Sequence, residues 1–168
     1  MIEPIITLGK KTVVAMVHLP ALPGSPDYDP EVGMNKILDA VVSDLEALQS
    51  GGVDAVMFGN EFDRPYVLKA PPEGLAALAA VIGQVKSMIM VPFGVNYLWD
   101  PLATVALALA TEANFAREIY TGLYASDMGL WAPDCAGAAR LRSSHGRLDL
   151  QMLFNINAEF ATSLDNRP

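Results

Sequence analysis

The chain has 168 residues, of which 52% are hydrophobic and 18% charged, and its formal net charge is −8 at pH 7. This length and apolar content suffice for one globular domain with a buried core, and they exclude an intrinsically disordered chain. The acidic balance argues against a nucleic-acid partner, because such binding depends on lysine and arginine side chains that neutralise phosphates.

Short runs rich in β-branched or aromatic residues alternate along the chain with segments of helical periodicity. The runs predict strands at 12–18, 54–58, 92–98, 115–120 and 150–157. The intervening segments predict helices at 34–52, 71–86, 100–113 and 132–146. Gly51 and Gly52 are expected to end the first helix, and Asp100 with Pro101 to begin the third.

Alternating strands and helices imply parallel pairing and right-handed crossovers, within one domain over residues 1–168. Two architectures fit this order, an open doubly wound sheet and a (β/α)₈ barrel. The first strand is not followed by the glycine-rich fingerprint of a dinucleotide-binding fold, but by a long loop with four prolines. A barrel usually needs ~250 residues, and only five β-α positions can be counted here. Periodicity alone leaves both architectures open.

The single cysteine, Cys135, cannot form an internal disulfide, which favours a reducing setting. The N-terminal residues lack the basic-then-apolar order of a signal peptide. The longest apolar run, 102–110, is shorter than the ~20 residues that a membrane-spanning helix needs. We therefore expect a cytoplasmic protein with no transmembrane segment.

Every predicted strand carries polar residues at or beyond its carboxyl end, where parallel α/β folds gather their functional groups. We expect these side chains to converge on one site. The candidate residues are His18, Asn60, Glu61, Asp63, Arg64, Asn96, Arg117, Asp127 and Asn155.

The proton-transfer candidates are His18, Glu61 and Asp127. An imidazole titrates near pH ~6.5, and a strand-end carboxylate suits a base or a metal ligand. His18 is equally consistent with a packed histidine, and Asp127 with a turn before Gly129 rather than a functional position on a long loop. These three residues offer a mixed nitrogen and oxygen set, but no metal-binding spacing supports a divalent ion, and no cofactor motif is evident.

The remaining candidates are expected to bind substrate. Arg117 and Glu118 interrupt a strand that should be buried, and alternation points them to opposite faces. Arg117 either grips a substrate carboxylate or phosphate, or forms a structural ion pair with Glu61 or Glu118. Asn96 and Asn155 either hold substrate hydroxyls or bond within the protein. Asn60, Asp63 and Arg64 complete this set. The alternative for Glu61 and Asp63 is that both pair with Arg64 and shape the loop before Pro65.

Five segments stand in a characteristic order and spacing, namely MVHLPALPGSP, GGVDAVMFGNEFDRPY, PFGVNYLWDP, FAREIYTGLYASDMGLWAPD and LFNINAEFA. Together they resemble the BtpA/SgcQ family. The resemblance implies a phosphate-binding TIM-barrel type of fold, here reduced to about five β-α units. A partial barrel exposes two strand edges, so the chain is expected to be oligomeric or partly molten if it is truncated.

The resemblance implies two kinds of function. The first is an enzyme that acts on a small phosphorylated, sugar-like metabolite by acid/base chemistry. Isomerisation or epimerisation fits best, because no nucleophile or cofactor motif stands out in the sequence. The second is a non-catalytic assembly factor with a role like that in photosystem I biogenesis, in which the proline-rich loop and the MGLW segment form a partner surface. The resemblance also allows peripheral membrane association and a homo-oligomer. The family's label as a nucleoside triphosphatase finds no support, since no Walker motif is present.

Overall fold

A computed structural model describes residues 4–5 and 9–166 of the chain. Its main sheet is built from β1, β2, β3, β4 and β7, and a smaller sheet from β5, β6 and β8. The strands are β1 (Val14–His18), β2 (Ala55–Gly59), β3 (Phe93–Asn96), β4 (Phe115–Glu118), β5 (Tyr124–Ser126), β6 (Gly129–Trp131), β7 (Gln151–Phe154) and β8 (Thr162–Ser163). The helices are α1 (Gly33–Ser50), α2 (Pro72–Val85), the 3₁₀ turn η1 (Lys86–Met88), α3 (Pro101–Thr111) and α4 (Cys135–Ser144).

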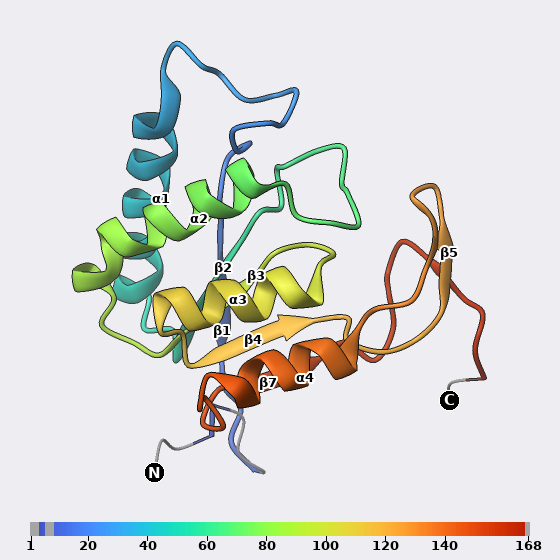
Figure 1. Cartoon of the computed structure of the whole chain (residues 1–168). Helices are drawn as coiled ribbons and strands as arrows, with labels where there is room; N and C mark the ends of the chain where they lie inside the picture. The colour runs from blue at the N-terminus through green and yellow to red at the C-terminus, as the bar shows by residue number, and fades with distance from the viewer. Residues whose placement is uncertain (1–3, 6–8, 167–168) are drawn as a thin grey trace.

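The strands of the main sheet are all parallel and follow one another in chain order, β1-β2-β3-β4-β7. A doubly wound sheet reverses its strand order at a switch point, whereas a barrel wall adds each strand beside the last. The four helices accompany the sheet as successive neighbours, α1 beside α2, α2 beside α3 and α3 beside α4 (Figure 1). Both features belong to the wall of a TIM-type barrel. The barrel does not close within the described residues, where β1 and β7 are the outer strands.

The predicted β-α alternation is confirmed, and local sequence explains most element ends. The Asp100 side chain accepts hydrogen bonds from the first backbone N–H groups of α3, with Pro101 at its first position. Gly51 ends α1, and Gly52 follows with φ +77°, a conformation that favours glycine. The third, fourth and fifth predicted strands extend beyond the observed β3, β4 and β7. Tyr97 and Ile119 belong to the connections that follow, and their apolar character reflects burial rather than sheet pairing.

The main core lies between the sheet and its helices. Large side chains such as Phe58, Leu45, Leu78 and Leu107 fill it and are almost fully buried. The opposite face of the sheet carries a smaller cluster that includes Met57 and Phe115. The helices therefore pack on one face of the sheet, as in the wall of a barrel.

The small antiparallel sheet was not predicted from the sequence. β5 and β6 form a hairpin within the connection from β4 to α4, and β8 from the C-terminal part pairs with β5. Figure 1 shows this hairpin beyond the end toward which β4 points. A third apolar cluster, with Trp99, Tyr124 and Trp131, lies beneath it. The hairpin thus covers part of the carboxyl end of the barrel wall.

Candidate functional site

A small cavity opens at the carboxyl end of the parallel strands and is called here the Arg117 cavity. Its volume is about 100 Å³. Three of the residues predicted from the sequence meet in it: Glu61 from the loop after β2, Arg117 from β4 and Asn155 from just beyond β7. The other lining residues are Tyr66, Leu98, Trp99, Glu159 and Phe160.

Arg117 provides the cationic group of this cavity. Glu118 points the other way, so the expected alternation of the two charged residues is confirmed. Among the described residues, no side chain forms an ion pair or a hydrogen bond with the Arg117 guanidinium. The structural ion pairs with Glu61 or Glu118, considered from the sequence, are therefore not formed. Five N–H donors remain for a ligand.

Glu61 is held in place by its own loop. Its Oε1 accepts a hydrogen bond from the Tyr66 hydroxyl at 3.0 Å and lies 3.5 Å from the Arg64 guanidinium. The side chain is about one third exposed. A carboxylate fixed by two partners and open to a cavity has the placement of a general base.

A larger hollow adjoins the Arg117 cavity and is called here the aromatic hollow. It measures about 490 Å³ and shares Tyr66, Trp99 and Phe160 with its neighbour. Arg64 and Asp127, both exposed and both predicted from the sequence, lie on its lining. The remaining lining residues are Pro65 and Met128. Asp127 occupies the tip of the β5–β6 hairpin, which corrects the expectation of a long loop without a turn.

Asn60 and Asp63 do not face either hollow, because both are buried inside the loop that carries them. Asp63 accepts hydrogen bonds from the Leu22 backbone N–H at 3.3 Å, the Tyr97 hydroxyl at 3.1 Å and the Asn60 amide at 3.4 Å. Asn60 accepts from the Leu98 backbone N–H at 2.8 Å. These groups join the loops after β1, β2 and β3. Of the two pairings with Arg64 considered from the sequence, the one with Glu61 is formed and the one with Asp63 is not.

Tyr97 is a neutral donor in this network. Burial raises the pKa of its hydroxyl well above the usual range, and the neighbouring Asp63 carboxylate raises that pKa further. We call Asn60, Asp63 and Tyr97 the loop network. Its members join the loops of the rim and line neither the Arg117 cavity nor the aromatic hollow.

Asn96 is likewise occupied inside the protein. Its amide donates to the Glu118 carboxyl at 2.7 Å, and the Ile119 backbone N–H and the Thr104 hydroxyl donate to the same group at 2.7 and 3.5 Å. Burial raises the pKa of Glu118 to about 8, although these hydrogen bonds oppose the shift. The alternative of internal bonding is therefore realised for Asn96. Its neighbour Asn155 differs, because it lines the Arg117 cavity.

His18 ends β1 at the rim but does not line the Arg117 cavity or the aromatic hollow. Its ring is partly buried and packs edge-on against Phe62, with the centroids 6.0 Å apart. The acid/base role of His18 stays a prediction. Within the described part of the chain, no group of three or more His, Cys, Asp or Glu residues is placed to hold a metal ion.

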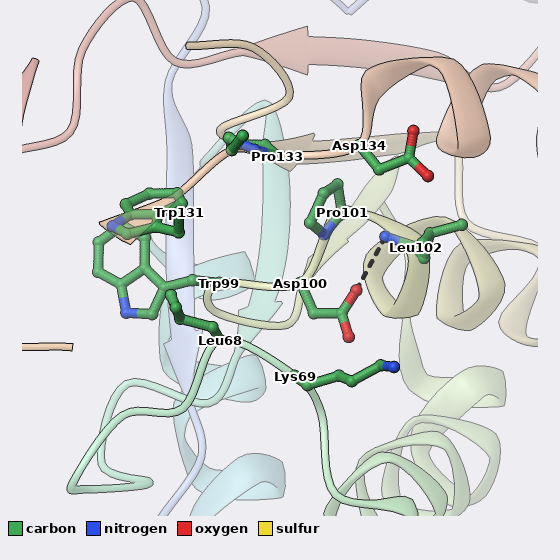
Figure 2. A pocket seen from close by; sticks show the side chains of 10 residues that line it. Leu68, Lys69, Trp99, Asp100, Pro101, Leu102, Trp131, Pro133 and Asp134 are labelled. Atoms are coloured by element: carbon green, nitrogen blue, oxygen red, sulfur yellow. Dashed lines mark hydrogen bonds between the residues drawn. The ribbon is translucent and has the colours of Figure 1, made fainter. Parts of the chain in front are cut away.

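A further hollow of about 380 Å³ lies on another side of Trp99, between the beginnings of α3 and α4 (Figure 2). Its two carboxylates cap the N-termini of α3 and α4. Asp100 accepts from the Leu102 backbone N–H, which Figure 2 marks, and Asp134 accepts from that of Gly137 at 2.7 Å. Both aspartates are occupied as helix caps, so their carboxylates are not free to bind a ligand, in contrast to the Arg117 guanidinium.

The sequence prediction omitted several lining residues. Glu159 follows the last predicted strand, 150–157, by two residues and lines the Arg117 cavity, but it is not among the candidates predicted from the sequence. Tyr66, Met128 and Phe160 gave no polar signal, and they are found only because the loops after β2, β4 and β7 converge in space. Among the described residues, no helix has the length and apolar character needed to span a membrane.

Comparison with known proteins adds family and fold. The model of the BtpA family matches residues 9–168. The chain is 52% identical over 158 residues to the sgc region protein SgcQ of Escherichia coli, covering 94% of the chain and 59% of SgcQ. It is 29% identical over 121 residues to the photosystem I biogenesis protein BtpA of Synechocystis, covering 70% of the chain and 42% of that protein.

Among solved structures, the fold is similar to that of 7,8-dihydropteroate synthase from Vibrio fischeri, with a TM-score of 0.60. The sequence identity is 13%, and the alignment covers 92% of this chain and 48% of the synthase. At this identity the likeness concerns the fold alone. The chain spans less than two thirds of the length of each of these three proteins.

Proposed function

The chain belongs to the BtpA family, and on that premise we propose that it binds a small phosphorylated, sugar-like metabolite at its strand ends and isomerises it. The observation that carries this proposal is the Arg117 cavity. It combines an arginine that has no partner among the described residues, a hydrogen-bonded carboxylate and an amide at the carboxyl-terminal rim of a barrel wall. That rim is where barrel enzymes carry their active sites.

In this proposal each of three residues has a separate task. Arg117 binds the anionic group through paired N–H donors, in the geometry that suits phosphate and carboxylate. Asn155 offers an amide to a hydroxyl or carbonyl oxygen of the ligand. Glu61 takes the proton from the hydroxyl-bearing carbon beside a carbonyl, the hydroxyl proton passes to the carbonyl oxygen, and Glu61 returns its proton to the former carbonyl carbon. The protein ends as it began and no redox cofactor is consumed.

The test is a calorimetric titration with pentose and hexose phosphates, together with exchange of solvent deuterium into the bound sugar. We expect Arg117→Ala to weaken binding about 10-fold or more, because a hydrogen bond to a charged group contributes about 1.5–3 kcal/mol. Glu61→Gln should retain binding and lose exchange. The matched control is Arg140→Ala, which removes an exposed arginine of α4 far along the helix from its capped end.

Wild-type affinity in the Arg117→Ala variant would refute the anion site. Exchange that persists in Glu61→Gln would refute the assignment of the base. Arg140→Ala should match the wild type in both measurements. An effect of Arg117→Ala then comes from the loss of Arg117 itself and not from the loss of one positive charge.

The assembly-factor alternative receives less support from the structure. It relied on an apolar surface of the proline-rich loop, but Leu19 and Leu22 of that loop are fully buried. Leu130 of the MGLW segment is 72% exposed and is the part of that surface that remains. A role in photosystem I biogenesis is named for the Synechocystis relative, and a stable stoichiometric partner without metabolite binding would favour that role here.

A further inference from the structure

The Arg117 cavity is too small for a whole metabolite. Its volume is about 100 Å³, whereas pockets for small organic ligands measure roughly 300–1,000 Å³. A phosphate or carboxylate fits such a space, but the rest of the molecule must extend beyond it. The aromatic hollow, at about 490 Å³, adjoins it and shares Tyr66, Trp99 and Phe160 with it.

Aromatic side chains form a large part of the lining of the aromatic hollow. Tyr66 and Trp99 meet edge-to-face, with centroids 5.9 Å apart and planes at 84°. Trp99 and Phe160 meet in the same manner at 6.5 Å and 84°. Met128 and Pro65 add further apolar surface. Aromatic and thioether side chains of this kind favour contact with another planar ring.

The polar groups on this lining are few and partly occupied. The Arg64 guanidinium lies 5.7 Å from the centre of the Tyr66 ring and is paired with Glu61. Asp127 is exposed at the hairpin tip. A sugar buried here would leave hydroxyl groups without partners, at a cost in binding free energy. An aromatic ring has no such requirement.

We propose that the aromatic hollow is a second subsite, which takes a planar aromatic or heteroaromatic ring attached to the anionic group held by Arg117. This inference rests on the proposed function for its anionic end, and it narrows the ligand to a phosphorylated, sugar-like metabolite that also carries a ring. Tyr66, Trp99 and Phe160 contact the ring in this arrangement, and Met128 lies at its edge.

Calorimetric titrations of the wild-type chain with three probes test the ring subsite. The probes are inorganic phosphate, ribose 5-phosphate and phenyl phosphate, which share the anion and differ in what is attached to it. We expect phenyl phosphate to bind about 10-fold more tightly than the other two, in keeping with the contribution of base–aromatic stacking. Tighter binding of ribose 5-phosphate than of phenyl phosphate would overturn the ring subsite.

Phe160→Ala is the informative variant, because this side chain is 67% exposed and its loss spares the core. It should weaken phenyl phosphate about 5-fold and inorganic phosphate by less, because Phe160 also lines the Arg117 cavity but offers phosphate neither a charge nor a hydrogen bond. Ile156→Ala, which removes an 81% exposed side chain that lines neither hollow, is the matched control. Equal losses for both probes in Phe160→Ala would contradict a specific ring contact.

Arg117→Ala separates the two proposals. It should weaken all three probes alike, because the anion is common to them. If phenyl phosphate binds no better than phosphate while Arg117→Ala still weakens both, the ring subsite fails and the anion site stands. If Arg117→Ala alters no probe, the proposed function fails with it.

Discussion

Two pairs of polar residues within the loop after β2 have opposite surroundings. Asn60 and Asp63 are at least nine-tenths buried and hydrogen-bonded to neighbouring loops. Glu61 and Arg64 lie beside them in sequence, reach the two hollows and pair with each other. Strand-end polarity thus has two uses here. One pair fixes the loops, and the other presents charge to a ligand.

The difference follows from what each group bonds to. Buried polar groups must find partners inside the protein, because leaving them unpaired is costly. Asp63 satisfies this requirement with two side-chain donors and one backbone donor. Glu61 bonds to Tyr66 and Arg64 at the edge of the cavity, where water or a ligand supplies its remaining hydrogen bonds. Substitutions in the two pairs should therefore affect different properties.

Asp63→Ala should produce the largest effect in this comparison. It leaves three buried donors without their acceptor, from Leu22, Tyr97 and Asn60. Each unsatisfied buried donor costs about 1–3 kcal/mol, so we expect a loss of about 3 kcal/mol in the free energy of unfolding. Urea denaturation measures it. Asp127→Ala, at the exposed hairpin tip, should unfold at the wild-type urea concentration. Similar urea midpoints for Asp63→Ala and Asp127→Ala would contradict the distinction between polar residues that fix the loops and polar residues that face a ligand.

Glu118→Gln should have an intermediate effect, seen in the pH dependence of stability. The pKa of Glu118 is about 8 in the folded protein, above its value of about 4.3 in an unfolded chain. Between these values the folded state holds an additional proton. Stability is therefore highest at low pH and falls as pH rises toward 8, by at most about 1.4 kcal/mol per pH unit.

Glutamine does not ionise, so the part of the pH dependence of stability that comes from Glu118 should disappear in Glu118→Gln. Urea unfolding of both proteins at several values between about pH 5 and pH 8 checks it. Asn96→Asp would place a second carboxyl beside the first and should steepen the wild-type dependence. Parallel pH profiles for wild type and Glu118→Gln would show that Glu118 does not titrate in this range.

Arg64→Ala should have the smallest effect on stability. The side chain is 58% exposed, and its ion pair with Glu61 is at the surface. Exposed pairs of this kind contribute little to folding. We expect an unchanged urea midpoint together with weaker binding of phosphorylated ligands, measured by calorimetry. A clear loss of stability would place Arg64 with the loop network instead.

Local sequence patterns were sufficient for the strands of the main sheet and for the helices that cover it. Apolar runs of strand length, helical spacing and the Asp100–Pro101 start signal each depend on nearby residues, and the structure confirms the elements they predict. The choice between barrel and open sheet depended on strand order, which periodicity does not encode. The β5–β6 hairpin was missed because its strands have three residues each, and β8 pairs with β5 from far along the chain.

The candidate site was only partly accessible from sequence. Position at the end of a strand identified Glu61 and Asn155, and the interruption of an apolar strand by charge identified Arg117. These three residues meet in one cavity. Strand-end position also selected Asn60, Asp63 and Asn96, whose side chains are buried and bonded internally. Burial at a strand end depends on which loop covers it, here the proline-rich loop through Leu22. No local pattern reports that contact.

Crystals of the chain soaked with tungstate, a heavy analogue of phosphate, provide the most direct test of the anion site. We expect an anomalous density peak within the cavity, with oxygen atoms about 2.7–2.9 Å from the Arg117 guanidinium. The peak should be absent in Arg117→Ala crystals grown and soaked alike. Tungstate bound only at other arginines, with none beside Arg117, would contradict an anion site in the Arg117 cavity.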